Sequence, residues 1–288
     1  MSAAPALADR LELPHSRLRV SRCCLGLVAS PEIVLAAYEA GINFFFLTAD
    51  MHWPLYEPAR EGLRRLLRSD PGARERIVVA VVSYVTQPEF CYAPFEEVVE
   101  AVPELGHVDI GVIGGSYPAD FFTRLAEYER RRPAGMRGIG ATFHHRQSAV
   151  TAIEHELLDI AFIRYNAGHA GAERDVFPEL RKDRRVKLFN FKSMWGHVPR
   201  ARLDALGVPK DNWRPEPTDH YRFALRRPEI DGVLCAFDSP EHPLELARAL
   251  EREPLTEQEA DYMKTLAALD AGEIELSAAD AHELPGVS

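Results

Sequence analysis

Cysteine is scarce in this 288-residue chain, and its four cysteines show no spacing typical of a disulfide framework. Cys23 and Cys24 are adjacent, Cys91 and Cys235 stand alone, and no C-x-x-C pair occurs. Small secreted domains that depend on disulfides carry many more cysteines for their length. We therefore expect reduced thiols, and we exclude a scaffold stabilised by disulfides.

Long apolar runs are also missing, because nowhere do eighteen apolar residues follow one another. The start of the sequence lacks the basic region and the apolar run of a secretory signal. We therefore expect neither a membrane span nor secretion, and we predict a cytoplasmic protein.

Excess positive charge is lacking too, since 34 Lys and Arg residues oppose 44 Asp and Glu residues, a formal net charge of -10. Proteins that bind nucleic acids generally present a cationic surface to the phosphates. The charge balance excludes a general nucleic-acid binder and favours an enzyme with a small-molecule substrate. It leaves the oligomeric state open.

What the chain does contain is an alternation of short β-branched or aromatic runs with amphipathic stretches. Parallel strands joined by crossover helices produce this pattern. The predicted strands are residues 22–27, 43–48, 77–85, 108–113, 138–143, 160–165, 187–191 and 232–237. The predicted helices are approximately residues 31–40, 57–67, 95–102, 118–131, 147–156, 172–180, 219–227 and 240–250.

Eight strands alternating with eight helices predict an α/β fold, the (β/α)8 or TIM barrel. The length suits a single domain over residues 1–288, with a core at about 18–270 and a C-terminal tail at 271–288. A helix start at residues 254–259 precedes this tail. The segment 196–217 is longer than an ordinary connection, and it lies either over the active-site mouth or on the surface without a role there.

One stretch, residues 41–52, reads G-I-N-F-F-F-L-T-A-D-M-H. It resembles the second barrel strand of the aldo/keto reductases, which reads approximately G-I-N-F-F-D-T-A-x-x-Y-G. Further matches to the other strands and the last helix of that family follow in the same order across residues 20–266. They are residues 20–26, 107–110, 138–140, 165–166, 191–196, 230–234 and 254–256. The resemblance implies an aldo/keto reductase-like barrel.

The resemblance also implies a catalytic tetrad, and the matching positions of this chain are altered. Reductases of the family use a Tyr general acid assisted by a Lys–Asp pair, with a His that polarises the carbonyl. Leu47 stands at the position of the Asp and His52 at that of the Tyr. The Lys position falls at or beside Ser83, and the His position at or beside Gly114. We therefore expect a divergent member that does not carry out ordinary carbonyl reduction.

The positions that hold the nicotinamide cofactor in that family are altered as well. Its Ser-Asn pair matches Thr142 and Phe143, and its Gln falls near Phe162, so two polar contacts become aromatic. The loop 238–242 is acidic, whereas binding of the 2′-phosphate of NADPH would require Arg or Lys there. No cofactor is favoured, and NAD(P)H remains an alternative. The candidate contacts to such a cofactor are Thr142, Asn166 and Ser239.

The candidate catalytic residues close the predicted strands, because the active site of a (β/α)8 barrel lies at the carboxyl ends of its strands. They are Asp50, His52, His144 and Lys192. His52 is favoured, because imidazole titrates near neutral pH and can act as acid or base. A solvated loop histidine beside Trp53 is the alternative, and Lys192 has a binding or structural role as its alternative.

Substrate-binding candidates at the same strand ends are Trp53, Tyr84, Arg164, Tyr165 and Trp195. Arg164 could clamp a carboxylate or make an internal ion pair. Together these side chains favour a small anionic or aromatic molecule. Metal ligands could come from Asp50 and from the histidines near strand ends, which are His52, His144, His145, His169 and His197. No local spacing such as H-E-x-x-H supports a metal site, so a divalent metal is disfavoured.

Three functions are consistent with these features. The first is an isomerase, lyase or dehydratase that works by proton transfer, and the second is a divergent NAD(P)H-dependent reductase. The third is a non-catalytic binding or scaffold barrel. An intact strand order with an altered relay favours the first over the second. Ionisable residues at many strand ends favour either enzyme over a scaffold.

Overall fold

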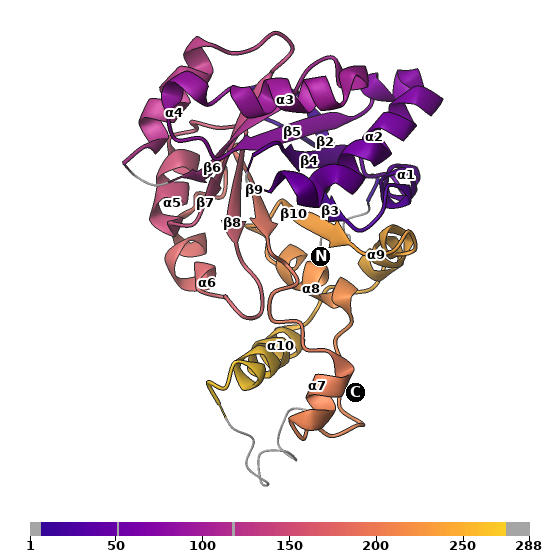
Figure 1. Cartoon of the computed structure of the whole chain (residues 1–288). Coiled ribbons are helices and arrows are strands. Elements are labelled where there is room, and N and C mark those ends of the chain that lie inside the picture. Colours follow the sequence, from indigo (N-terminus) through magenta and orange to yellow (C-terminus); the bar gives the residue numbers. More distant parts are fainter. Residues whose placement is uncertain (1–6, 51, 117–118, 275–288) are drawn as a thin grey trace.

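Eight parallel strands close into a barrel in the computed structural model, which describes residues 7–50, 52–116 and 119–274 (Figure 1). Each strand pairs with the next along the chain, and the last pairs with the first. The strands are β3 (Cys23–Val28), β4 (Phe44–Thr48), β5 (Val78–Ser83), β6 (Ile110–Ser116), β7 (Gly138–Phe143), β8 (Ile160–Arg164), β9 (Lys187–Phe191) and β10 (Gly232–Phe237). The predicted (β/α)8 barrel is confirmed.

Helices surround this barrel and follow its strands in turn (Figure 1). They are α1 (Glu32–Glu39), α2 (Glu57–Ser69), α3 (Ala93–Ala101), α4 (Phe121–Arg130), α5 (Arg146–Glu154), α6 (Ala172–Asp175), α8 (Pro217–Leu225) and α9 (His242–Leu250). The predicted start of α4 at residue 118 lies outside the described residues. The helix predicted at 172–180 was too long, because Pro178 disfavours helical backbone at the residue before it, and a 3-10 turn at Phe177–Glu179 replaces the second half.

An antiparallel hairpin that the sequence did not predict covers the amino end of the barrel. Its strands β1 (Arg10–Glu12) and β2 (Arg19–Ser21) are three residues long, too short to show a period. The backbone amides of His15 and Ser16 in its turn donate to the Asp159 carboxylate at 2.9 and 2.8 Å. Asp159 directly precedes β8, so the hairpin is fixed to the amino ends of the strands.

Aromatic side chains fill the inside of the barrel. Phe44 and Phe46 of β4 meet Phe162 of β8 and Phe189 of β9 edge to face, with ring centroids 5.4 to 5.8 Å apart. All four side chains are buried. The interior is therefore a packed core and not a channel, and a ligand can bind only at an end of the barrel.

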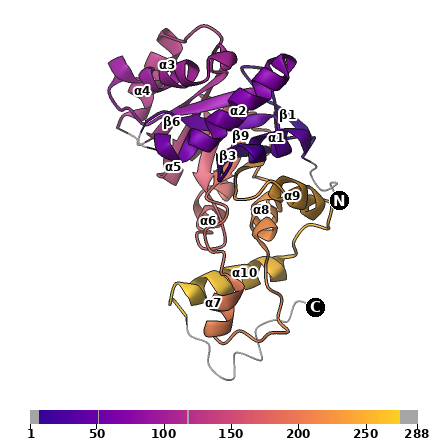
Figure 2. The same ribbon diagram turned by 45° about the vertical axis from the view of Figure 1, so that its right-hand side comes forward.

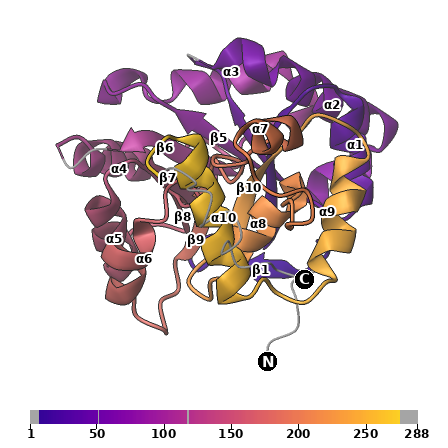
Figure 3. The ribbon, with the colours of Figure 1, turned by 90° about the horizontal axis from the view of Figure 1, so that it is seen from below.

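The segment 196–217 packs beside the last helix, α10 (Glu257–Asp270), and contains the short helix α7 (Arg200–Ala205). Figures 1 and 2 show both helices projecting from one end of the barrel, and Figure 3 shows them across that end. Val198, Leu203 and Val208 bury their side chains against α10. The segment thus builds a small core of its own. No helix within the described residues is long and apolar enough to cross a membrane.

A buried histidine, His220, and a half-buried one, His197, lie where this segment meets α8, and they make stability depend on pH. Nδ1 of His197 is 3.3 Å from Nε2 of His220, and His220 is 2% exposed. Burial, and secondarily His197, lowers the pKa of His220 to about 3, while burial lowers the pKa of His197. Below pH 6.5 the two imidazoles therefore take up protons in the unfolded chain but stay neutral in the folded protein. The free energy of unfolding thus decreases as the pH falls from 6.5 toward 3.

We expect the free energy of unfolding to fall by about 2 kcal/mol between pH 7 and pH 5 through His220 alone. Urea denaturation at several pH values measures this slope. His220→Gln should flatten it, whereas His155→Gln, which changes an exposed histidine at the end of α5, should not. An unchanged slope in His220→Gln would assign the acid sensitivity to other groups.

Candidate active site

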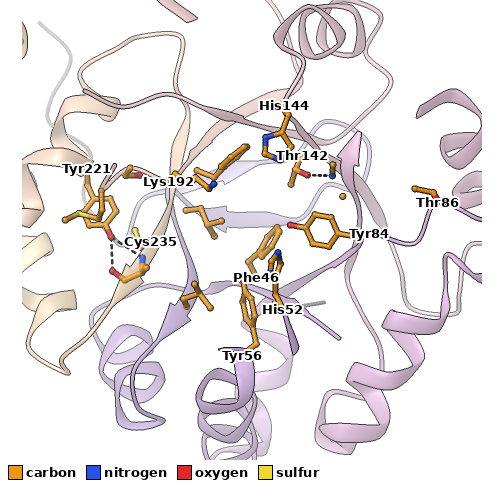
Figure 4. A pocket seen from close by; sticks show the side chains of 18 residues that line it. Phe46, His52, Tyr56, Tyr84, Thr86, Thr142, His144, Lys192, Tyr221 and Cys235 are labelled. Atoms are coloured by element: carbon orange, nitrogen blue, oxygen red, sulfur yellow. Dashed lines mark hydrogen bonds between the residues drawn. The ribbon is translucent and has the colours of Figure 1, made fainter. Parts of the chain in front are cut away.

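A pocket of about 570 Å³ opens at the carboxyl ends of the strands (Figure 4). Its walls are largely apolar, and they carry a few polar side chains. The apolar lining includes Leu27, Phe46, Phe191, Met194 and Leu234, and the polar side chains are those of His52, Tyr56, Tyr84, Thr86, Thr142, His144, Lys192, Ser193, Tyr221 and Cys235. None of the described lining residues is Asp or Glu. Such a pocket suits a ligand with an apolar body and no positive charge.

One wall of the pocket carries His52 and Tyr84 (Figure 4). The two rings are perpendicular, with centroids 5.5 Å apart. His52 is exposed and lies between β4 and a 3-10 turn, whereas Tyr84 directly follows β5. Burial, with a smaller effect of the Asp50 charge, raises the pKa of Tyr84 to about 12. The phenol therefore stays protonated at neutral pH, and the imidazole of His52 stands beside it on this wall.

Asp50 positions this wall and is not among the residues that line the pocket, so its catalytic role stays a prediction. One carboxylate oxygen accepts from the backbone amide of Tyr84 at 2.6 Å. The other accepts from the hydroxyl of Thr48 at 2.8 Å. Because both oxygens are engaged, Asp50 connects the ends of β4 and β5 and fixes the place of Tyr84.

Phe46, rather than Leu47, points into the barrel from β4. Phe46 lines the pocket, whereas Leu47 is buried and does not line it. Successive side chains of a strand point to opposite faces, so Leu47 faces the surrounding helices. This corrects the position that the sequence match assigned to the acidic residue of the tetrad. The inward position holds an aromatic ring.

Gly114 of β6 has no room for a side chain. A Cβ atom at this position would lie 2.7 Å from Cδ1 of Tyr84 and 2.9 Å from the carbonyl oxygen of Ser83. The Tyr84 ring therefore occupies the space that a side chain on residue 114 would need. Ser83 is fully buried and lies outside the pocket lining.

Lys192 lies on the other side of the pocket, directly after β9 (Figure 4). Its φ angle is 57°, a left-handed conformation that is unfavourable for a lysine. The side-chain amide of Asn166 donates to the Lys192 carbonyl at 2.8 Å and stabilises this turn. Asn166 is fully buried and positions Lys192, and its cofactor contact stays a prediction.

Two cations face Trp195 beside the pocket. Nζ of Lys192 lies 4.7 Å from the centre of the Trp195 ring, and Cζ of Arg164 lies 5.9 Å from it. Neither cation has an ion-pair partner among the described residues, although most arginines of this chain do. Trp195 itself is 49% exposed. The cations are therefore available to an anionic ligand.

His144 stands beside these cations at the rim of the pocket (Figure 4). Its ring meets that of Phe191 edge to face, with centroids 5.6 Å apart. Desolvation, then the charges of Lys192 and Arg164, lower the pKa of His144. Its imidazole is therefore neutral at pH 7 and can accept a proton.

Three other residues predicted to contact a ligand are not among the residues that line the pocket. Tyr165 is fully buried toward the helices, and its hydroxyl donates to Glu173 at 2.6 Å, because it alternates with Arg164 along the chain. Trp53 packs under the guanidinium of Arg60 at 3.2 Å. Ser239 lies in the exposed loop after β10, where it bonds to Glu241. Thr142 lines the pocket as predicted, and its hydroxyl accepts from the Gly115 amide at 2.8 Å.

The histidines considered as metal ligands do not come together. His197 pairs with His220, His169 packs against Trp195, and His145 caps the start of α5. In the described part of the chain, no group of three or more His, Cys, Asp or Glu side chains could hold a metal ion.

Several lining residues carried no signal in the sequence. Phe46, Phe191 and Leu234 are apolar strand residues, and only the barrel decides which of them point inward. Tyr221 comes from α8, and its hydroxyl donates to the Ala236 carbonyl at 2.9 Å. Inward-facing strand residues near the carboxyl ends could have been selected by alternation, but a helix residue could not.

Solved structures of aldo-keto reductases share this architecture. The holo form of aldo-keto reductase AKR11C1 from Bacillus halodurans has a TM-score of 0.70 and 15% identity, and the alignment covers 90% of this chain and 96% of that one. The glycerol dehydrogenase AKR11B4 from Gluconobacter oxydans has a TM-score of 0.67 and 13% identity, with 94% and 98% covered. The thermostable aldo-keto reductase Tm1743, in complex with the inhibitor epalrestat, has a TM-score of 0.64 and 17% identity, with 89% and 99% covered.

No family model and no curated protein matches the sequence. The structural likeness shows that this chain has the aldo/keto reductase fold, and at these identities it shows the fold alone.

Proposed function

We propose that this chain is an enzyme that transfers protons on a small anionic metabolite with an apolar body, an isomerase, lyase or dehydratase. One observation carries the proposal. The pocket sets the exposed imidazole of His52 opposite the cation of Lys192 and the neutral imidazole of His144 (Figure 4). The substrate class follows from the apolar lining and from the two cations beside Trp195, which have no ion pair within the described part of the chain.

In the proposed reaction, Lys192 and Arg164 hold the carboxylate of the substrate at the rim, and the apolar body enters the pocket. His52 removes a proton from the carbon next to a carbonyl, and the protonated phenol of Tyr84 donates a hydrogen bond to the enolate oxygen. The proton then returns to another carbon in an isomerase, or a leaving group departs in a lyase or dehydratase. The neutral His144 is the second group that can accept or return the proton.

Ordinary carbonyl reduction receives less support from the same residues. Reduction needs an acid that protonates the alkoxide as hydride arrives, and the raised pKa of Tyr84 makes its phenol a poor donor. Lys192 is the only lysine among the described lining residues, and no carboxylate accompanies it there. A divergent NAD(P)H-dependent reductase stays the second candidate, because the fold is shared with proteins described as aldo-keto reductases.

We expect NADPH and NADH to bind weakly. Phe143 and Phe162 are fully buried in the barrel, and the Thr142 hydroxyl already accepts from Gly115. The Ser239 hydroxyl bonds to Glu241 in an acidic loop. A carboxamide buried without its hydrogen bonds costs about 1–3 kcal/mol per unpaired group, which lowers affinity by one or two decades. Fluorescence titration measures the affinity, and a micromolar dissociation constant at physiological salt would favour the reductase.

The proposal is tested by exchange of substrate protons with solvent deuterium. The protein is incubated in D2O with 2-oxo acids that carry aryl or branched alkyl groups, and proton NMR follows the signal of the carbon next to the carbonyl. We expect loss of that signal without any nicotinamide cofactor. Reduction of the same compounds with NADPH, and no exchange without it, would establish the reductase. Binding with neither reaction would establish a non-catalytic barrel.

A further inference from the structure

A second depression, of about 660 Å³, lies at the amino end of the barrel, opposite the candidate active site. It is bordered by the β1–β2 hairpin and by the connections that lead into β5, β6 and β7. Six arginines, one histidine and two acidic residues line it. They are Arg10, Arg17, Arg19, Arg74, Arg76 and Arg137, with His107, Glu75 and Asp109. This concentration of positive charge stands out in a chain with a formal net charge of -10.

Three of the six arginines have carboxylate partners. Arg17 pairs with Glu12 at 2.7 Å, Arg74 pairs with Asp109 at 3.1 Å, and Arg76 pairs with Asp70. Arg74 also donates to the carbonyls of residues 105 and 107, so it holds the adjoining loop. These three guanidinium groups are explained by the fold itself.

The other three have no carboxylate ion pair among the described residues. Arg10 donates to the Gly41 carbonyl at 2.9 Å, and Arg137 donates to the Ser16 carbonyl at 3.0 Å. Arg19 is exposed, and its guanidinium makes no hydrogen bond within the described residues. Desolvation, and then the nearby charge of Arg19, lower the pKa of Arg10, and the charge of Asp9 offsets part of this effect. Arg10 and Arg19 therefore repel each other across the depression, and a bound anion would relieve this repulsion.

The acidic residues of the depression do not supply that anion. Asp109 accepts from the Val79 amide at 2.8 Å and pairs with Arg74, so its carboxylate is committed to β5. Glu75 has no ion pair with any described lysine or arginine and is exposed. Guanidinium groups bind phosphate oxygens through paired hydrogen bonds, and several of them spread over one depression match an anion with several phosphates.

We propose that this depression is a binding site for a polyphosphate, recognised by Arg19, Arg10 and Arg137. No Phe, Tyr or Trp is among the described lining residues, so recognition falls on the phosphate chain and not on a base or another ring. The site is independent of the proposed proton transfer, because it lies at the opposite end of the barrel and shares no residue with that pocket.

Calorimetric titration with inorganic tripolyphosphate tests the site on the full chain. We expect one binding event that weakens as the salt concentration rises, and Arg19→Ser should weaken it about tenfold, since a hydrogen bond to a charged group contributes about that factor. Arg19→Ser removes no described intramolecular bond and should fold normally, which circular dichroism checks. Arg248→Ser is the matched control, because it removes an exposed arginine of α9 that has no ion pair within the described residues.

The control should bind tripolyphosphate within a factor of two of the unaltered protein, as an order-of-magnitude expectation for a distant surface charge. Absence of binding by the unaltered protein would overturn the proposal. So would equal weakening by Arg19→Ser and Arg248→Ser, since that result means non-specific attraction. Undiminished binding by Arg19→Ser would overturn it as well, because the polyphosphate would then be held elsewhere.

Discussion

His52→Ala lowers turnover by about 100- to 10,000-fold and leaves the fold intact, the range expected for removal of a general acid or base. The reason is the position of His52, exposed on the pocket wall beside a phenol that stays protonated. The deuterium exchange assay measures the rate, and circular dichroism checks the fold. Tyr84→Phe is the matched control on the same wall, because it keeps the ring and should reduce turnover by a smaller factor.

Near-normal turnover of His52→Ala would exclude His52 as the proton-transferring group. It would direct attention to His144, His145 and Lys192, the other ionisable residues near the carboxyl ends. Of these, His144 and Lys192 line the pocket, whereas the His145 ring bonds to Ser148 at the start of α5.

His52→Tyr is expected to give no carbonyl reductase activity. A phenol at this position would have no lysine and carboxylate beside it, because none of the described lining residues is acidic and Lys192 lies on the other side of the pocket. Its pKa would therefore stay near 10, the ordinary value of a phenol. NADPH oxidation with aldehyde substrates measures the activity, and substantial turnover would contradict this reading of the pocket.

Arg124→Met lowers the free energy of unfolding by about 2–5 kcal/mol, because it leaves two buried carbonyls without their donor. Arg124 lies on α4 and is fully buried. Its guanidinium donates to the Gly114 carbonyl at 2.9 Å and to the Ser83 carbonyl at 2.7 Å. It thereby connects the carboxyl ends of β5 and β6, which place Tyr84 and Gly115 at the pocket.

Urea denaturation measures this loss, and Arg130→Met is its control. Arg130 is on the same helix, but it is exposed and pairs with Glu127 at the surface at 2.7 Å. Such a pair contributes about 1 kcal/mol or less. Similar losses for the two variants would show that water replaces the Arg124 guanidinium at the two carbonyls.

The candidate site could be predicted only in part, because the strand-end rule selects positions and not directions. The rule found His52, Tyr84, His144 and Lys192, which do line the pocket. It also selected Tyr165, which alternation turns toward the helices. The direction of a residue just beyond a strand depends on the exact register and the local turn, and short motifs do not fix either.

The roles of the buried polar residues could not be predicted from the sequence for a related reason. Asp50 and Asn166 have side chains of the types found in catalytic or binding sites, yet each makes a hydrogen bond to the backbone of a strand-end residue. Arg124 looks like a surface residue of an amphipathic helix, and it is buried against two strand ends. Each has a partner far away along the chain, Tyr84 at 34 residues for Asp50, Lys192 at 26 for Asn166 and Ser83 at 41 for Arg124, so only the folded arrangement brings these groups together.

The sequence by itself determined the eight barrel strands and most of the helices, because hydrophobic periodicity and turn residues are local properties. Strands β7, β9 and β10 have the predicted bounds, since each run of strand-forming residues is bordered by residues that end it. Tertiary structure alone decided that Phe46 points inward, that Tyr84 fills the space beside Gly114, and that the cations of Arg164 and Lys192 have no ion pair with any described residue. Those features depend on packing between distant strands, which no local pattern encodes.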